Sequence, residues 1–372
     1  MTDRPLRVLH LHSGNMIGGI ESVLMTLASC RDLCPEMEQH FALAFDGDFA
    51  TMLRRTGAPV SLVPQVRLRY LPSVIASRHH FKLLLDDTPV DAVITHSSWT
   101  QLIYAGVIRE KKIPLLFWMH GPFDGHWLQK LASFQVPDFV ICNSAYTRST
   151  LDRCYPRVRS RIIHYPVRVR GGMRDRQEVR AELGAADCDV VIVCAARMEE
   201  WKGHHNLIEA IAALRTQSAW RVWIAGAPNT PDEKSYFESL QRLAQERGVT
   251  DRIRFLGHRS DVPSLMAAAD IHCQPNAAPE PFGVVFIEAL QAGLPVVTFA
   301  AGGPREILDA NSGVLISPGD QQGLTAALKK LIENPALRQK PGAAGPARAR
   351  ALTDPGTQMG KLRDAIQSVV HR

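Results

Sequence analysis

The chain has 372 residues, of which 45% are hydrophobic and 22% charged, and its formal net charge is +6. This length allows two domains with separate cores, and the mildly basic balance fits a phosphorylated substrate, an anionic membrane surface or scattered surface arginines. No basic tract with interleaved aromatic residues indicates nucleic acid. We expect neither a signal peptide nor a membrane-spanning helix, because no apolar run is suitable.

Short apolar runs alternate with helical patterns along the whole chain. We expect strands at 7–13, 41–45, 60–63, 91–96, 114–120, 138–142, 161–165, 189–196, 220–226, 253–257, 270–275, 295–299 and 313–317. Strands separated by helices form parallel sheets with right-handed crossovers. Because thirteen strands are too many for one ordinary doubly wound sheet, the sequence predicts an α/β protein with two Rossmann-like domains.

Two segments without apolar periodicity divide the chain. Residues 167–179 are rich in arginine and glycine, and a second break is expected at 340–356. We therefore predict an N-terminal domain at 1–168 and a C-terminal domain at 169–356, with a last helix at about 357–372 that could pack back on the first domain. Ligands would lie at the C-terminal ends of the strands, in the cleft between the domains.

Seven cysteines occur, and their odd number and dispersed spacing do not suggest a disulfide framework. Reduced, mostly buried thiols are expected, which favours the cytoplasm, including the inner face of a membrane.

The most informative segment is PEPFGVVFIEALQAGLPVV at 279–297, which reads as a loop, a short apolar helix and a buried strand. Glu280 would lie on the loop beside the helix N-terminus, and Glu288 within the helix. A helix N-terminus attracts phosphate. A carboxylate on either side of such a site suits a sugar nucleotide, because each can accept hydrogen bonds from a pair of hydroxyls.

Cations and glycines follow other strands. Arg197 and Lys202 precede a helix and could hold a diphosphate, although two exposed charges are the alternative. Gly18 and Gly19 permit close backbone approach to a ligand, or only a tight turn. The acidic pair at 199–200 suggests nothing beyond solvated surface.

Histidines occur in several contexts. His120 ends a strand and would point into the ligand crevice, or be a satisfied core histidine. Gly257 and His258 belong to a loop where a nucleobase could stack or form hydrogen bonds, or to a plain connection. His204 and His205 look like an exposed pair.

These motifs occur in one order: Gly-Gly-x-Glu, His-Gly, R-x4-K-G, FLG-x3-D-V, E-P-F-G-x4-E and G-G-x-x-E. The set resembles the retaining glycosyltransferases of the GT-B fold, family four, which includes glycogen-synthase-like and mannosyltransferase-like enzymes. The resemblance covers nearly the whole chain and is strongest at 196–319. One departure is Tyr165-Pro166-Val167-Arg168-Val169, where the family usually has P-N-G-V-D.

The resemblance implies two Rossmann-like domains facing across a cleft, and a role for each matching residue. Catalytic contacts would come from His120, Arg197, Lys202 and Glu280. The donor would be bound by Gly18, Gly19, Arg197, Lys202, Gly257, His258, Phe282, Gly283, Val284 and Glu288. Within this set, Glu288 would hold the ribose and Glu280 the donor sugar. Glu306 matches a recurring acidic position of uncertain role.

The implied reaction moves a hexose from a nucleotide diphosphate sugar, foremost a UDP- or GDP-sugar, to an acceptor hydroxyl with retention of configuration. It would serve the synthesis of cell-surface polysaccharide, glycolipid or glycoconjugate. The diphosphate would take the acceptor proton, so no metal or other cofactor is expected. This fits the absence of an obvious second carboxylate in the N-terminal crevice.

The acceptor is expected to be a carbohydrate, a lipid-linked molecule or a small molecule, met by the N-terminal domain. Residues 66–82 mix basic and apolar side chains and could lie on an anionic membrane, or form an ordinary surface helix. Rival functions are a sugar-nucleotide epimerase or phosphorylase, and an inert sugar-nucleotide-binding partner subunit. A nicotinamide-dependent oxidoreductase is disfavoured, because no G-x-G-x-x-G follows a strand.

Overall fold

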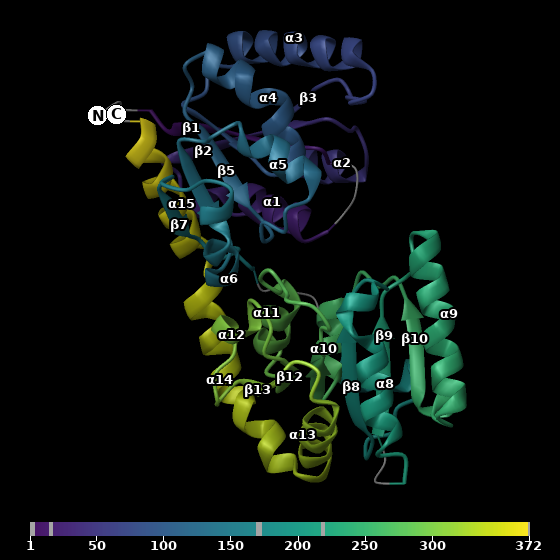
Figure 1. Cartoon of the computed structure of the whole chain (residues 1–372). Coiled ribbons are helices and arrows are strands. Elements are labelled where there is room, and N and C mark those ends of the chain that lie inside the picture. The colour runs from purple at the N-terminus through teal and green to yellow at the C-terminus, as the bar shows by residue number, and fades with distance from the viewer. Residues whose placement is uncertain (1–3, 15–17, 169–172, 217–219, 371–372) are drawn as a thin grey trace. The chain divides into compact units, whose positions relative to one another are not determined.

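The computed structural model describes residues 4–14, 18–168, 173–216 and 220–370. The chain divides into two compact units (Figure 1): unit 1 comprises 1–168 and 353–372, and unit 2 comprises 169–352. Part of the expected boundary segment, 169–172, lies outside the described residues.

Unit 1 is a parallel seven-stranded sheet with helices packed on it, in the strand order β3-β2-β1-β4-β5-β6-β7. Its strands are β1 Leu6–His12, β2 Met37–Leu43, β3 Val60–Leu62, β4 Ala92–Thr95, β5 Leu115–Met119, β6 Phe139–Cys142 and β7 Ser160–Ile162. Its helices are α1 Gly19–Ser29, η1 Arg31–Leu33, α2 Asp48–Arg55, α3 Leu71–Asp87, α4 Ser98–Glu110, α5 Trp127–Ser133, α6 Ala145–Ser149, η2 Leu151–Arg153 and α15 Pro355–Val370. The last of these, α15, packs against α1 and η1.

Unit 2 repeats this architecture with six parallel strands in the order β10-β9-β8-β11-β12-β13. Its strands are β8 Val190–Ala195, β9 Trp220–Ala225, β10 Ile253–Gly257, β11 Ile271–Cys273, β12 Val296–Phe299 and β13 Gly313–Ile316. Its helices are α7 Arg176–Glu182, η3 Glu200–Lys202, α8 His204–Ala212, α9 Pro231–Glu246, η4 Thr250–Arg252, α10 Val262–Ala268, α11 Val284–Gln291, α12 Pro304–Ile307, α13 Gln321–Glu333 and α14 Pro335–Thr353. The predicted fold class is thus confirmed, and the strands lie where the apolar runs predicted them.

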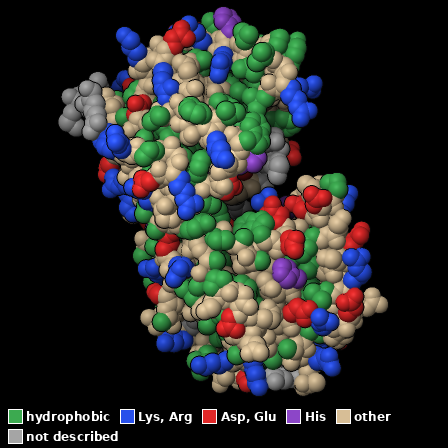
Figure 2. Space-filling view, in the orientation of Figure 1, with side chains coloured by type: hydrophobic (Ala, Val, Ile, Leu, Met, Phe, Trp, Pro, Cys, Tyr) green, Lys and Arg blue, Asp and Glu red, His purple; other side chains and the backbone are tan. Residues whose placement is uncertain are grey.

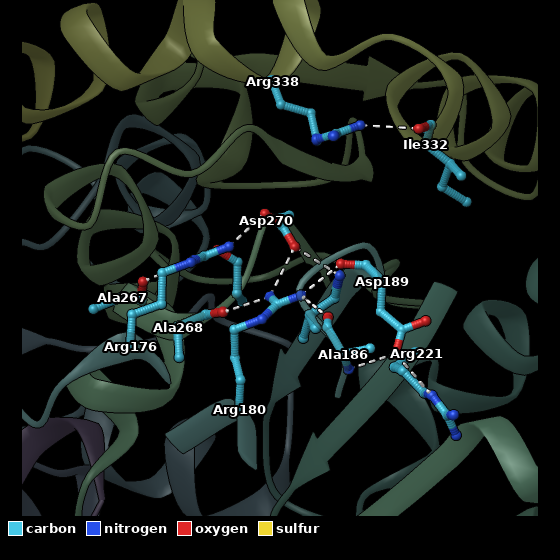
Figure 3. A network of polar contacts seen from close by, with 12 residues as sticks. Arg176, Arg180, Ala186, Asp189, Arg221, Ala267, Ala268, Asp270, Ile332 and Arg338 are labelled. Carbon is cyan, nitrogen blue, oxygen red and sulfur yellow. Dashed lines mark hydrogen bonds and ion pairs between the residues drawn. The ribbon is translucent and has the colours of Figure 1, made fainter. Parts of the chain in front are cut away.

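A buried arginine fixes the first helix of unit 2 to its sheet (Figure 3). The Arg180 side chain is 3% exposed and forms an ion pair with Asp270 at 3.2 Å. It also donates to the backbone oxygens of Ala268, Ala186 and Asp189 at 3.1, 2.7 and 2.6 Å. Because each of these partners is an acceptor, the buried guanidinium is compensated. These groups precede β8 and β11, at the N-terminal edge of the sheet.

The predicted break at 340–356 is wrong as an interruption of helical structure, because α14 runs through Pro335–Thr353, although the chain does pass from unit 2 to unit 1 within this segment. Packing outweighs the poor helix propensity of its glycines and prolines. A Cβ on Gly345 would lie 2.9 Å from the backbone oxygen of Leu290, so glycine allows a close approach there. Arg348 donates to the backbone oxygens of Glu306 and Ile307 at 2.7 and 3.1 Å, and so ties the helix to unit 2.

All seven cysteines lie in the described part of the chain and carry free thiols. Five are buried and Cys154 is partly buried, whereas Cys188 is exposed. Burial raises the pKa of the Cys142 and Cys194 thiols to about 12. Within the described ranges, no helix combines the length and the apolar character needed to cross a membrane.

Candidate functional site

The loop that carries Glu280 connects β11 with α11 in unit 2. Gly283 ends it with φ of 101°, a conformation that favours glycine, and a Cβ there would lie 2.4 Å from the Phe286 ring. Phe282 is buried and anchors the loop, so that Val284 begins α11. Glu280 itself is 8% exposed. The loop therefore presents its carboxylate from a fixed backbone beside the start of a helix.

The double glycine after β12 holds this loop in place. The N–H of Gly303 donates to the Glu280 oxygen at 2.7 Å, and the Glu280 N–H donates to the Ala301 oxygen at 3.2 Å. A Cβ on Gly302 would lie 2.2 Å from the Glu280 oxygen, and one on Gly303 2.3 Å from the Phe282 oxygen. The G-G-x-x-E motif thus supports the backbone of Glu280 through its two glycines.

Lys202 and Glu280 form an ion pair, with Nζ 2.7 Å from Oε2. Their side chains are 13% and 11% exposed. Asn276 donates to the same carboxylate oxygen at 2.8 Å, and Gln274 donates to Asn276 at 2.8 Å. The Lys202 ammonium also lies 3.8 Å from the centroid of the Trp201 ring, a cation–π contact. Sequence reasoning missed Trp201, Gln274 and Asn276.

Contact between the segment after β8 and the segment after β11 brings this pair together. The two strands are neighbours in the sheet, so their C-terminal ends are adjacent. Gly203 has φ of 73°, and a Cβ there would lie 1.8 Å from the Pro275 oxygen. The Ala277 N–H donates to the Trp201 oxygen at 2.8 Å. No larger residue would allow this approach, which explains the glycine in R-x4-K-G.

The other predicted residues of unit 2 lie around this edge. Arg197 follows β8, is half exposed and pairs with Glu199 at 3.0 Å. Glu199 also accepts a hydrogen bond from the Trp201 indole at 2.9 Å, so its interpretation as plain solvated surface is wrong. Glu288 lies half-buried on α11. Gly257 ends β10, and the exposed His258 follows it. Among the described residues, neither has a contact that assigns it a role.

In unit 1, a buried carboxylate lies at the end of β1. Glu21 accepts from the Gly18 N–H at 2.9 Å and shares a 2.7 Å hydrogen bond with Nε2 of His12. Burial acts to raise the pKa of Glu21, but the hydrogen bond and charge of His12 outweigh it, and the pKa is lowered. The expectation of no second carboxylate in this region is wrong, although Glu21 is the last residue of the Gly-Gly-x-Glu motif. Gly19 begins α1 with open space around it.

His120 follows β5 and forms hydrogen bonds with three residues of unit 1. Its Nδ1 lies 2.5 Å from the Tyr165 hydroxyl, its Nε2 lies 2.9 Å from Nδ1 of His96, and its backbone oxygen accepts from Asn143 at 2.9 Å. Burial lowers the pKa of His120 well below its usual value. A pocket of about 210 Å³ adjoins it, lined in part by Trp118.

The expected exposed pair at 204–205 is partly wrong. His204, the first residue of α8, is fully buried, and burial lowers its pKa to about 4. His205 is half-buried, and its ring nitrogen lies 3.1 Å from the Tyr236 hydroxyl. Within the described residues, no group of three or more His, Cys, Asp or Glu side chains could hold a metal ion.

Two units of alternating strands and helices, with the Glu280 loop in the second, define a protein of the GT-B class. The family model described as "Glycosyltransferase Family 4" matches residues 17–170, and that described as "Glycosyl transferases group 1" matches 175–348. The chain therefore belongs to the family-four glycosyltransferases of the GT-B fold.

Individual relatives agree with this assignment. The lipopolysaccharide core biosynthesis glycosyltransferase LpsE of Rhizobium meliloti is 29% identical over 58% of this chain and 60% of its own length. A GDP-mannose-dependent monoacylated alpha-(1-6)-phosphatidylinositol monomannoside mannosyltransferase of Corynebacterium glutamicum is 30% identical over 48% of this chain and 47% of its own. The chain thus matches only about half the length of these curated relatives. The crystal structure of Anabaena Alr3699/HepE in complex with UDP and glucose shares the fold, with a TM-score of 0.85, 24% identity and coverage of 98% and 100% of the two chains.

Proposed function

We propose that the protein transfers a hexose from a nucleotide diphosphate sugar to an acceptor hydroxyl with retention of configuration. The observation that carries this proposal is the ion pair of Lys202 and Glu280 beside the start of α11. A cation and a carboxylate at the C-terminal edge of a parallel sheet suit a ligand that has both phosphate and hydroxyl groups. The domain limits of this proposal are 1–168 and 169–356, with the last helix on the first domain.

The proposed chemistry gives each side chain a separate task. The bond between the anomeric carbon and the diphosphate oxygen breaks, and its electron pair stays on the diphosphate. Lys202 and Arg197 stabilise that negative charge. Glu280 accepts hydrogen bonds from the sugar hydroxyls, and Glu288 from the ribose. The acceptor oxygen attacks the same face, and its proton passes to the leaving diphosphate, so that neither a metal nor a protein base is needed.

The relatives support a UDP- or GDP-sugar and an acceptor in glycolipid or lipopolysaccharide synthesis. One relative is described as GDP-mannose-dependent, another as acting in lipopolysaccharide core biosynthesis, and a structural neighbour is in complex with UDP and glucose. The acceptor would meet unit 1, where His120 lies, and catalysis would occur on the cytoplasmic side of a membrane.

A thermal-shift panel of UDP, GDP, ADP and dTDP, each with its sugars, identifies the donor. At about 100 times its dissociation constant, the correct ligand should stabilise the protein by about 2.7 kcal/mol, which raises the melting temperature by roughly 5 °C or more. Glu288→Ala should abolish this shift, because the ribose contact is lost. Glu333→Ala, on the exposed end of α13, is the matched control and should retain it.

The same panel, followed by activity assays with the donor that binds, separates the rival functions. If no nucleotide or sugar nucleotide shifts the melting temperature, the proposed function is wrong. Binding without transfer to any acceptor would favour an inert partner subunit. Conversion of the donor sugar in the absence of acceptor would indicate an epimerase, and dependence on inorganic phosphate a phosphorylase.

A peripheral membrane contact belongs to the same proposal, and α3 supports it. The buried side of α3 carries Val74 and Phe81, whereas Leu71 and Ile75 are 69% and 67% exposed. Figure 2 shows hydrophobic, lysine and arginine side chains interspersed on the surface of unit 1. Trp127 and Leu131 of α5 and its C-cap residue Phe134 recur at helical spacing and are also exposed.

We expect the protein to float with anionic vesicles at low salt, because each basic residue near α3 contributes about 1 kcal/mol to the free energy of membrane binding. High salt screens this attraction and should release the protein. Ile75→Ser should weaken binding, since its apolar contact is lost. Val314→Ser, at an exposed apolar residue of unit 2, should not. If both variants float with the vesicles in equal amounts, or if the wild-type protein does not float, the proposed membrane contact is wrong.

A further inference from the structure

Five side chains of unit 1 form an unbroken line of hydrogen bonds. Asn143 donates to the Tyr165 hydroxyl at 3.0 Å, and that hydroxyl lies 2.5 Å from Nδ1 of His120. Nε2 of His120 lies 2.9 Å from Nδ1 of His96, and Nε2 of His96 lies 2.9 Å from Nδ1 of His10. The residues belong to, or follow, β1, β4, β5, β6 and β7, which are consecutive neighbours in the sheet. The line therefore takes one residue from each of these five strands or from the loop that follows it.

The three imidazoles of this line are neutral near pH 7. Burial lowers the pKa of His10 to about 3, and His40 acts in the same direction. Burial also lowers the pKa of His96 and His120 well below the usual value, with neighbouring histidines, among them His12, as the further cause. A neutral imidazole has one N–H donor and one acceptor nitrogen. The proton position on one ring therefore dictates the position on the next.

Asn143 and the relative strengths of the two possible Tyr165–His120 pairings set the direction of the line. One atom of its amide group contacts both the Tyr165 hydroxyl and the backbone oxygen of His120, at 3.0 and 2.9 Å. A backbone oxygen only accepts, so this atom is the amide nitrogen. The Tyr165 oxygen therefore accepts from Asn143. Between Tyr165 and His120 we infer that the phenol O–H donates to Nδ1. This is the stronger of the two possible pairings, because a phenol donates better than an imidazole N–H and an imidazole nitrogen accepts better than a phenol.

One tautomer follows for every ring. With Nδ1 of His120 as acceptor, its proton lies on Nε2 and is donated to His96. His96 then carries its own proton on Nε2 and donates it to His10. The His120 ring is also stacked on Trp118, with centroids 5.6 Å apart and planes 14° from parallel. Both ring nitrogens of His120 are thus occupied within unit 1.

We propose that Tyr165 and His96 are positioning residues that hold His120 in the Nε2–H tautomer, so that its ring exchanges no proton with substrate. Tyr165 stands at the boundary segment where the chain departs from the family's P-N-G-V-D pattern. Only the activity readout of the proposal rests on the proposed glycosyl transfer. The tautomer itself is a property of the folded protein.

The primary test is nitrogen-15 NMR of the histidine rings in the full chain. His10, His96 and His120 should all show the Nε2–H pattern, unchanged from about pH 6 to pH 8. A Nδ1–H pattern at His120, or titration of His120 within this range, would overturn the proposal. This measurement needs neither a variant nor enzymatic activity, so it succeeds or fails independently of the proposed function.

A pair of tyrosine variants provides the second test. Tyr165→Phe removes the donor to Nδ1 and should shift His120 toward a mixture of tautomers, with a loss of turnover of up to about tenfold, as expected for one hydrogen bond. Tyr155→Phe is the matched control, because its buried hydroxyl contacts the Ala132 backbone oxygen instead. It should leave the His120 pattern unchanged. An unchanged His120 pattern in Tyr165→Phe would also overturn the proposal.

Discussion

Replacing Lys202 with methionine is expected to lower sugar transfer about 10²–10³-fold, the loss typical when one group that stabilises a leaving charge is removed. Methionine keeps the apolar stem beside Trp201 but removes the ammonium that pairs with Glu280. The leaving diphosphate then loses a positive charge, and Glu280 retains Asn276 as a neutral donor. The measurement is kcat/KM at donor concentrations far below saturation.

Two further variants make this result specific. Lys111→Met removes another lysine that is ion-paired with a carboxylate, Asp86, and should leave transfer unchanged. In the double variant with Glu280→Gln, the two losses should not add, because both residues belong to one pair. Wild-type kcat/KM in Lys202→Met, in a protein that is still folded, would show that the site assignment is wrong.

Acid should destabilise the protein strongly, because several buried histidines remain neutral in the folded state. Burial lowers the pKa of His10 and His272 to about 3 and that of His204 to about 4. In the unfolded chain their pKa is about 6.5, so the unfolded state binds more protons below that pH. Stability is therefore complete above pH 6.5 and falls as the pH drops toward the folded-state values. At pH 4, each of these histidines should remove about 3 kcal/mol.

Urea unfolding measured between pH 7 and pH 4 tests this expectation. His272→Leu should reduce the slope of unfolding free energy against pH by about 1.4 kcal/mol per unit, the value for one proton. His79→Asn, at an exposed histidine of α3, should leave the slope unchanged. A free energy that stays constant between pH 6.5 and pH 4 would contradict the assignment of these histidines as buried and neutral.

The fold was more predictable than the site. The strands are short apolar runs that end at Gly, Pro or polar residues, and burial on both faces of a parallel sheet requires such runs. The break expected at 340–356 failed for a different reason. It followed from local propensity, whereas α14 is held by Arg348 and by the close packing of Gly345 on Leu290.

The site depends on which strands are neighbours, and the sequence alone does not show this. Lys202 and Glu280 are separated by 78 positions and meet because β8 lies beside β11. The sequence analysis did not single out His10 or His96, and only the sheet order shows that they continue a line from His120. Lys202 and Glu280 could be singled out because each lies on a segment that precedes a helix, with Gly203 next to Lys202 and Gly283 three residues after Glu280.

Cys188 gives the wild-type chain a natural attachment point for a reporter dye. It precedes β8, at the edge of the unit 2 sheet opposite Lys202 and Glu280. It is the exposed thiol of the seven, and the pKa of the buried Cys142 and Cys194 is about 12, which suppresses the reactive thiolate. Brief treatment with a maleimide at neutral pH should therefore label one position without engineered substitutions. Fluorescence from that position would follow unit 2 during ligand titrations without obstructing the candidate site.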